Sequence, residues 1–258
     1  MKITTIGIII LSFLLLMGVV FLSYLQITAI KEKIEELNQL ADNEKINKDN
    51  WIQTTDSAIN RVQTEKAFLM AQQEVSRSNS IVLVLNLPDS LAALSIKGLY
   101  VHDAKIKDYA IDPIFKAVNP VASMQFFSKP LKITELKSSI KKVPLLIKIA
   151  PRDTSEYIPD LQTDTSDIEV VNYVLQTNHG IQLLFNEINP VAFSGQSNRK
   201  KTGIAENFMH NISQIKNYAQ GNKPNYFPQI YISLSRKDAK IIYRAIPDTA
   251  LLVLKILP

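Results

Sequence analysis

The first 27 residues hold a long apolar run that carries no charge. From Ile3 to Leu25 the sequence reads ITTIGIIILSFLLLMGVVFLSYL, and Lys2 is the only charged side chain before it. About 20 such residues in a helix cross roughly 30 Å of hydrocarbon. A signal peptide normally has an apolar region of about 7–15 residues that ends at small residues, and no small-x-small site follows Leu25. The sequence therefore predicts an uncleaved transmembrane anchor over residues 1–27, rather than a signal peptide or a buried core helix.

The charges that flank this anchor do not decide its orientation. Lys2 and the terminal amine precede the span, whereas Lys31 and Lys33 follow it, so the positive-inside rule gives no clear direction. A very short polar tail ahead of a span more often stays in the cytoplasm. We therefore expect a single-pass signal-anchor in the inner (cytoplasmic) membrane, with the C-terminal domain in the periplasm or outside the cell.

A polar segment with a helical pattern follows the apolar run. Between Gly18 and Pro88 the sequence has no Gly or Pro, and apolar residues recur at heptad a/d spacing. They form two stripes: Ile27, Ile30, Ile34, Leu37 and Ala41, then Ile52, Ile59, Val62 and Leu69. The polar run at 42–50 holds a phase break or a short loop between them. This pattern predicts a helical coiled-coil stalk over residues 28–79. It fits a homodimer, and it also fits helices that pack back on the globular domain or stand alone as a linker.

From Ser80 onward the pattern is typical of strands. Short apolar runs predict strands at 81–85, 94–102, 104–111, 144–150 and 250–257, with Gly98 interrupting the second of them. Runs at 170–176 and 181–187 flank Asn178-His179-Gly180, a compact loop that predicts a hairpin. Helices are expected at about 204–215 and after Ser235, whose hydroxyl with Asp238 fits a capping box. Residues 80–258 therefore predict a mainly β domain with a few short helices, arranged as a sandwich or barrel-like body.

The composition excludes several kinds of chemistry. The chain has no Cys, which rules out disulfide scaffolds, thiolate zinc sites, iron–sulfur clusters and cysteine nucleophiles. Its three His, at 102, 179 and 210, are far apart in sequence, which argues against a histidine-based metal site. We expect no metal and no cofactor.

Basic clusters account for the positive charge of the C-terminal domain. They lie at 137–148, 199–201 and 236–244. Nucleic acid is the usual partner of such clusters, but an exported domain would not meet it and no nucleic-acid motif is present. Anionic lipid headgroups or wall polymers are more plausible partners, and solvated surface is the simplest explanation.

Three local patterns could carry chemistry, and each has a simpler explanation. Residues 197–203, SNRKKTG, combine the S-x-x-K and K-T-G motifs of penicillin-binding proteins, but in those enzymes the motifs come from distant parts of the chain. S-x-x-K also begins at Ser138, Ser139 and Ser213, a number that chance explains. His179 has no partner at a catalytic spacing, so we expect an exposed turn histidine. An acidic group lacks the calcium-loop pattern and is expected to be a solvated loop: Asp160, Asp164, Asp167 and Glu169.

The two ends of the C-terminal domain carry a longer pattern. Residues 229–247 read QIYISLSRKDAKIIYRAIP, and a last apolar run follows. This segment resembles the end of the L,D-transpeptidase catalytic domain, in which a histidine, glycine, cysteine and arginine segment leads into Leu-Ser, an Asp-Ala helix, a turn and a final strand. Residues 81–85 and 91–99 are similar to the two opening strands of that domain. The middle of the domain has no clear counterpart.

Carried over position by position, the resemblance implies a fold that has lost its chemistry. The nucleophilic cysteine of the family falls on Tyr231 and its histidine falls on Gln229. Its glycine falls on Ile230 and its arginine falls on Ser233. A phenol with a pKa of about 10 does not replace a thiolate, and glutamine is not a base. These are therefore degenerate former active-site positions, and we expect no catalytic residue. If the Tyr231 ring is buried in the old substrate channel, Tyr231→Ala should cost about 3–5 kcal/mol.

Together these features predict a non-catalytic, membrane-anchored envelope protein, or pseudoenzyme. Its β domain would bind peptidoglycan or another envelope protein. One alternative is a subunit of an envelope-spanning secretion or motility complex, in which the membrane helix packs on partners. The other alternative is a hydrolase with an unrecognised site near Ser197 or around Asp164 and Asp167.

Overall fold

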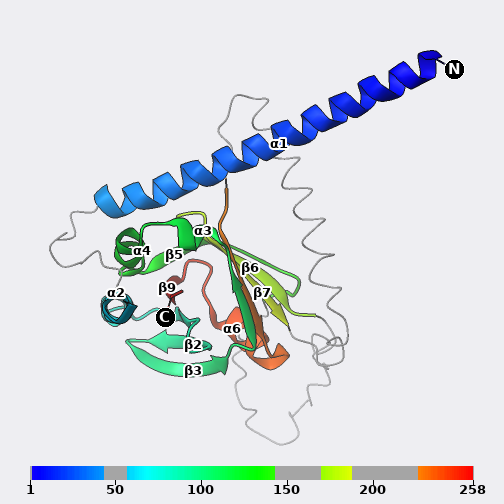
Figure 1. The fold of residues 1–258 in the computed structure, drawn as a ribbon. Coiled ribbons are helices and arrows are strands. Elements are labelled where there is room, and N and C mark those ends of the chain that lie inside the picture. The colour runs from blue at the N-terminus through cyan, green and yellow to red at the C-terminus, as the bar shows by residue number, and fades with distance from the viewer. Residues whose placement is uncertain (1, 44–56, 143–169, 188–225, 258) are drawn as a thin grey trace, which may run out of the picture. The chain divides into compact units, whose positions relative to one another are not determined.

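The computed structural model describes residues 2–43, 57–142, 170–187 and 226–257 (Figure 1). The helices are α1 (Lys2–Asn43), α2 (Ser57–Val75), α3 (Ile114–Ala117), α4 (Pro120–Phe127) and α6 (Arg236–Ala245). The strands are β1 (Val82–Asn86), β2 (Leu91–Ile96), β3 (Leu99–Lys105), β4 (Asp108–Ile111), β5 (Leu131–Ser138), β6 (Asn172–Thr177), β7 (Gln182–Glu187), β8 (Gln229–Leu234) and β9 (Leu251–Lys255). These elements fall into two compact units. One holds α1, α3 and most of α4, and the other holds α2, α6 and all nine strands.

In the first unit, α1 is one continuous helix of 42 residues. Toward its C-terminal end, residues at four-residue spacing are buried: Leu25, Ala29, Lys33 and Leu37. Leu37 packs against Val118 and Ala122, next to α3 and in α4. Asn38 accepts a hydrogen bond from the backbone N–H of Asn119 at 3.2 Å through its side-chain oxygen.

Between Phe13 and Ile27, α1 has several large apolar side chains that are exposed. The large exposed ones are Phe13, Leu16, Met17, Val20, Phe21, Tyr24 and Ile27. Among the helical residues that the structure describes, none forms a stretch long and apolar enough to cross a membrane. The anchor expected over residues 1–27 stays a prediction, and so do the domain boundaries at 28–79 and 80–258.

In the second unit, the strands form one mixed sheet with the order β3-β2-β1-β9-β5-β6-β7-β8-β4. β1 with β9 and β7 with β8 are parallel pairs, and the other pairs are antiparallel. β5 pairs with β9 through Leu131 and Lys132, and with β6 from Ile133 to Ser138, across an irregularity between Ile133 and Glu135. One strand thus joins the two halves of the sheet. The expected mainly β fold with a few short helices is confirmed, whereas its sandwich or barrel-like arrangement stays a prediction.

Helix α2 packs on the sheet, beside β9 (Figure 1). Its buried residues Phe68, Ala71 and Val75 form a core cluster with Val82, Val84, Ala93 and Val253 of the strands. Lys255 at the end of β9 donates a hydrogen bond of 2.6 Å to Glu65 of α2. The second half of the predicted stalk therefore packs back on the β domain, which is one of the alternatives that the sequence left open.

Two hairpins show how turn chemistry shapes the sheet. The turn between β6 and β7 contains Gly180 at φ +75°, as the sequence predicts. The turn between β2 and β3 has positive φ at both Lys97 and Gly98, which is typical of a type I′ turn. A Cβ at Gly98 would also lie 3.0 Å from Cβ of Ser76, so this position needs glycine. The run expected at 94–102, which the sequence shows interrupted at Gly98, is the end of β2 and the start of β3 on either side of this turn.

Candidate functional site

The four positions that the sequence resemblance assigns to a former active site lie on β8, and the strand divides them between two faces. Ile230, Ile232 and Leu234 are fully buried. Gln229 and Ser233 are half-buried, and Tyr231 is 37% exposed. Since successive side chains of a strand point to opposite faces, Gln229, Tyr231 and Ser233 share the accessible face, and Ile230 belongs to the core.

The accessible face of β8 continues onto its neighbours as three rows of side chains that run across the strands. The first row joins Gln176 of β6, Gln182 of β7 and Gln229 of β8. The second row joins Val174, Leu184, Tyr231 and Ala110 of β4. Leu184 is buried, so the exposed apolar surface of this row comes from Tyr231 and Ala110, with Val174 half-buried. The third row joins Asn172, Asn186, Ser233 and Asp108. We call these eleven residues the amide face, because five of them carry side-chain amides.

A chain of hydrogen bonds holds the centre of the amide face. The Tyr231 hydroxyl donates to Oε1 of Gln229 at 2.6 Å. Nε2 of Gln229 donates to Oε1 of Gln182 on the neighbouring strand at 3.3 Å. Tyr231 and Gln229 therefore bond to each other and to the neighbouring strand. The eleven residues of the amide face include no Cys and no His.

The opposite face of the same strands is core. Tyr173 and Phe185 stack there with ring centroids 4.6 Å apart, and Tyr243 of α6 tilts against Tyr173 at 5.4 Å. The Tyr173 hydroxyl is buried without a hydrogen-bond partner among the described residues. Burial raises the pKa of this phenol well above its ordinary value, because the phenolate would lose its hydration. This face holds the sheet rigid behind the amide face.

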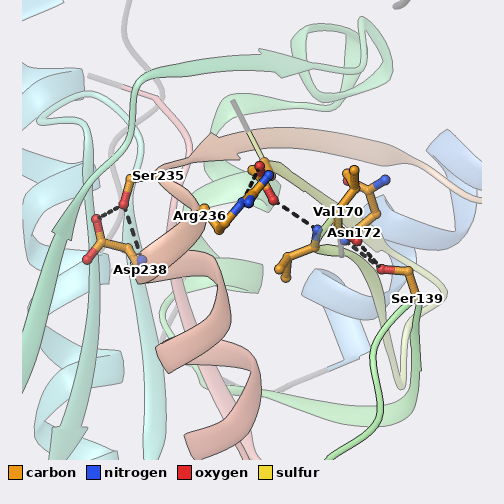
Figure 2. A network of polar contacts seen from close by, with 8 residues as sticks. Ser139, Val170, Asn172, Ser235, Arg236 and Asp238 are labelled. Atoms are coloured by element: carbon orange, nitrogen blue, oxygen red, sulfur yellow. Dashed lines mark hydrogen bonds and ion pairs between the residues drawn. The ribbon is translucent and has the colours of Figure 1, made fainter. Parts of the chain in front are cut away.

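A second polar network joins the end of β7 to the start of α6 (Figure 2). The Glu187 side chain is 1% exposed, and its Oε1 accepts from Nε of Arg236 at 2.6 Å. Its Oε2 accepts from the backbone N–H of Val171 at 3.0 Å. The Ser139 hydroxyl donates to the Val170 carbonyl at 2.7 Å and accepts from the N–H of Asn172 at 3.0 Å. The buried carboxylate therefore has both oxygens paired, and the network fixes the ends of β5, β6 and β7.

The start of α6 brings a serine, an aspartate and a histidine together, but not in a catalytic order. The Ser235 hydroxyl donates to Oδ2 of Asp238 at 2.6 Å and accepts from the Asp238 N–H at 3.2 Å. Nε2 of His102, on β3, lies 3.4 Å from Oδ1 of Asp238. A nucleophilic serine needs the imidazole between itself and the carboxylate, whereas here the carboxylate lies between. The group caps α6, as the sequence predicts.

The other sequence candidates either have structural roles or lie outside the described residues. Lys142 of the Ser139 motif donates to the Ile246 carbonyl at 2.7 Å and to Asp248 at 2.6 Å, while the Ser139 hydroxyl bonds to backbone. His179 lies half-buried in the β6–β7 turn, 3.0 Å from the Asn178 amide. The segment 197–203 and the acidic group at 160–169 are outside the described residues. Within the described part of the chain, no three His, Asp or Glu are grouped to hold a metal ion.

The amide face itself was not predicted from the sequence. The alternation in QIYISL is visible along β8, but the rows arise from the register of four strands. Comparison with known proteins adds no assignment: no family model, curated protein or solved structure matches the chain.

Proposed function

We propose that the protein is a non-catalytic, membrane-anchored envelope protein whose β domain binds peptidoglycan. The observation that carries this proposal is the amide face, where Tyr231, Gln229 and Ser233 stand at the positions to which the L,D-transpeptidase resemblance assigns a cysteine, a histidine and an arginine. A wall-enzyme fold that loses its nucleophile and keeps a polar, accessible face is suited to binding the same polymer without cutting or joining it.

The uncharged run from Ile3 to Leu25 supports the membrane anchor. Between Phe13 and Ile27, α1 has large apolar side chains that are exposed. Contact of these side chains with water is unfavourable, whereas contact with lipid is not. We propose a single span in the cytoplasmic membrane, with the β domain on the side of the wall.

The loss of catalysis follows from the residue types. Acyl transfer through an enzyme intermediate needs an activated nucleophile and a base that takes its proton. The Tyr231 hydroxyl donates a hydrogen bond to the amide oxygen of Gln229. An amide oxygen is too weak a base to take the proton from a phenol. We therefore expect Tyr231→Cys to show no transpeptidase activity in a wall-peptide exchange assay, since Gln229 still stands where the base would be.

Co-sedimentation tests the proposal. The full chain in detergent micelles is mixed with purified sacculi and, separately, with envelope membrane extract free of sacculi. We expect the protein to pellet with sacculi and to stay in solution when the sacculi are digested with a muramidase. Retention by a protein of the membrane extract alone, with no binding to sacculi, would replace peptidoglycan by a protein partner. Binding to neither would contradict the proposal.

A further inference from the structure

The amide face has a layered chemistry that specifies a class of ligand. Two polar rows border one row that is mostly apolar: Val174, Leu184, Tyr231 and Ala110. Neighbouring rows on one face are separated by two residues along each strand, or about 7 Å. The middle row crosses four strands spaced about 4.8 Å apart, and so extends over about 14 Å. Such a surface fits a ribbon-like polymer that lies across the strands, with an apolar face and polar edges.

The charge on the amide face is small. Its polar members on β6, β7 and β8 are neutral amides and hydroxyls: Asn172, Gln176, Gln182, Asn186, Gln229, Tyr231 and Ser233. Asp108 stands at the outer end of the third row. On the other side, β5 continues the rows with Glu135 and Lys137, which form an ion pair of 2.8 Å with each other. A polyanionic ligand would find no excess of cations here, so the face favours an uncharged ligand.

The side-chain groups match those of an N-acetylated sugar. An amide side chain offers both a donor and an acceptor, and can therefore bond to hydroxyl and acetamido groups alike. Gln182 accepts from Gln229 through its oxygen, which directs its NH₂ group to other acceptors. The Tyr231 ring, anchored through its hydroxyl and 37% exposed, supplies an apolar surface with a polar tip. A pyranose ring has the complementary pattern, with C–H groups on its faces and polar groups around its edge.

We propose that the amide face binds the glycan strand of peptidoglycan, a neutral run of N-acetylated sugars, rather than its carboxylate-bearing peptide stems. This inference rests on the proposed function and names the part of the wall that is recognised. The strand lies along the middle row, with sugar rings against Tyr231 and with hydroxyl and acetamido groups on the two polar rows.

Calorimetric titration of the full chain with the hexamer of N-acetylglucosamine tests this inference. The protein is held in a zwitterionic detergent without a sugar headgroup, because a maltoside would compete. We expect a dissociation constant of about 1 mM or tighter. We expect weaker binding of cellohexaose, which has the same linkage but lacks the acetamido groups, and none of a synthetic stem pentapeptide.

Matched variants locate the site. Tyr231→Ala and Gln182→Ala should each weaken hexamer binding by about fivefold or more. Tyr109→Ala is the control for the first, because Tyr109 is also 37% exposed but lies on the opposite face, paired with Ile232. Gln73→Ala, at an exposed position of α2, is the control for the second. Both controls should bind the hexamer as the parent does. Thermal unfolding of each variant shows whether it is folded. If Tyr231→Ala does not fold, the binding of the hexamer by Gln182→Ala tests the site.

The experiments distinguish a failure of the glycan site from a failure of the proposed wall-binding function. Binding to sacculi without binding to the hexamer, or hexamer binding that Gln182→Ala leaves unchanged, would overturn the glycan site and keep the wall-binding protein. Binding of the stem pentapeptide in place of the hexamer would move recognition to the peptide. A protein that binds neither sacculi nor the hexamer would overturn both.

Discussion

Tyr231 shows how the exposure of a side chain sets its contribution to stability. A ring buried in an old substrate channel would cost about 3–5 kcal/mol on truncation to alanine. The ring is 37% exposed, so the condition for that cost is not met. We expect Tyr231→Ala to lower the free energy of unfolding by about 1–2 kcal/mol, because only part of the ring leaves water on folding. Urea unfolding of the two proteins measures the difference, and a loss above about 3 kcal/mol would show that the ring packs as core.

Tyr173 is the opposite case, a buried phenol on the core face of β6. Its hydroxyl lacks a partner among the described residues, while its ring stacks on Phe185. We expect Tyr173→Phe to be neutral or to stabilise the protein by up to about 1 kcal/mol at pH 7, since it removes an unpaired buried polar group and keeps the ring. Tyr173→Ala is the contrasting variant, and should cost about 3–5 kcal/mol because it leaves a cavity. A Tyr173→Phe protein destabilised as strongly as Tyr173→Ala would show that the hydroxyl is bonded.

Tyr173 also makes the stability of the folded protein depend on pH in the alkaline range. The pKa of Tyr173 is raised in the folded state by burial, so above the unfolded-state value of about 10 the unfolded chain loses this proton first. Folding stability is therefore fully present below about pH 10 and falls as the pH rises toward the folded-state pKa. Unfolding free energies measured from pH 8 to pH 11 should fall less steeply in Tyr173→Phe than in the parent. Equal slopes would mean that other groups set the alkaline limit.

At the scale of elements, the junction of β7 and α6 depends on a buried carboxylate. Arg236→Ala would leave the Glu187 side chain, which is 1% exposed, with one charged partner fewer. We expect a cost of about 2–3 kcal/mol, below that of a fully buried pair because the arginine is 37% exposed. Lys237→Ala, next in the chain and exposed, should change stability by less than about 0.5 kcal/mol. Chemical denaturation of both variants tests this, and equal effects would remove the special role of Arg236.

Helix α2 has one face on the sheet and one apolar stripe facing outward. Phe68 is 5% exposed, whereas Val62 is 70% and Leu69 is 52% exposed. The outward residues belong to the second heptad stripe, so the homodimer that the sequence suggests stays a prediction with a clear test. We expect the full chain in micelles to sediment as a dimer, and Val62→Glu with Leu69→Glu to yield monomers with unchanged secondary structure. A monomeric parent would contradict dimerisation through this helix.

Elements set by local signals were predictable, and elements set by distant pairing were not. The β6–β7 hairpin and the capped helix α6 follow from Gly180 and Ser235. The break between β2 and β3 is visible in the sequence at Gly98, but the tight turn there was not predictable, because Lys97, which is not a typical turn residue, also takes a positive φ. β5 was missed because its polar residues at 132, 134 and 135 interrupt the apolar pattern. In the site, the alternation along β8 is visible in sequence, but the rows need the parallel pairing of β8 with β7, more than 40 positions away.

At the scale of the whole molecule, the proposed function requires a membrane anchor as well as a wall-binding sheet. Membrane anchoring predicts that the full chain stays in the membrane fraction after a carbonate wash, and that a chain lacking residues 1–27 does not. The prediction rests on the sequence alone, in which the run from Ile3 to Leu25 carries no charge. Equal release of both proteins by carbonate would contradict the anchor.

The central claim is that the amide face, and not another surface of the sheet, meets the wall. A photo-crosslinking residue, p-benzoylphenylalanine, replaces Asn186 in one full-length protein and Tyr109 in another; both positions are exposed, and they lie on opposite faces of the sheet. Each protein is illuminated with purified sacculi in micelles, and the covalently attached protein is measured after boiling in detergent. We predict that the protein with the crosslinker at position 186 becomes attached to sacculi and that the protein with the crosslinker at position 109 does not. Attachment from position 109 alone, or from neither position while the protein still binds sacculi, would contradict it.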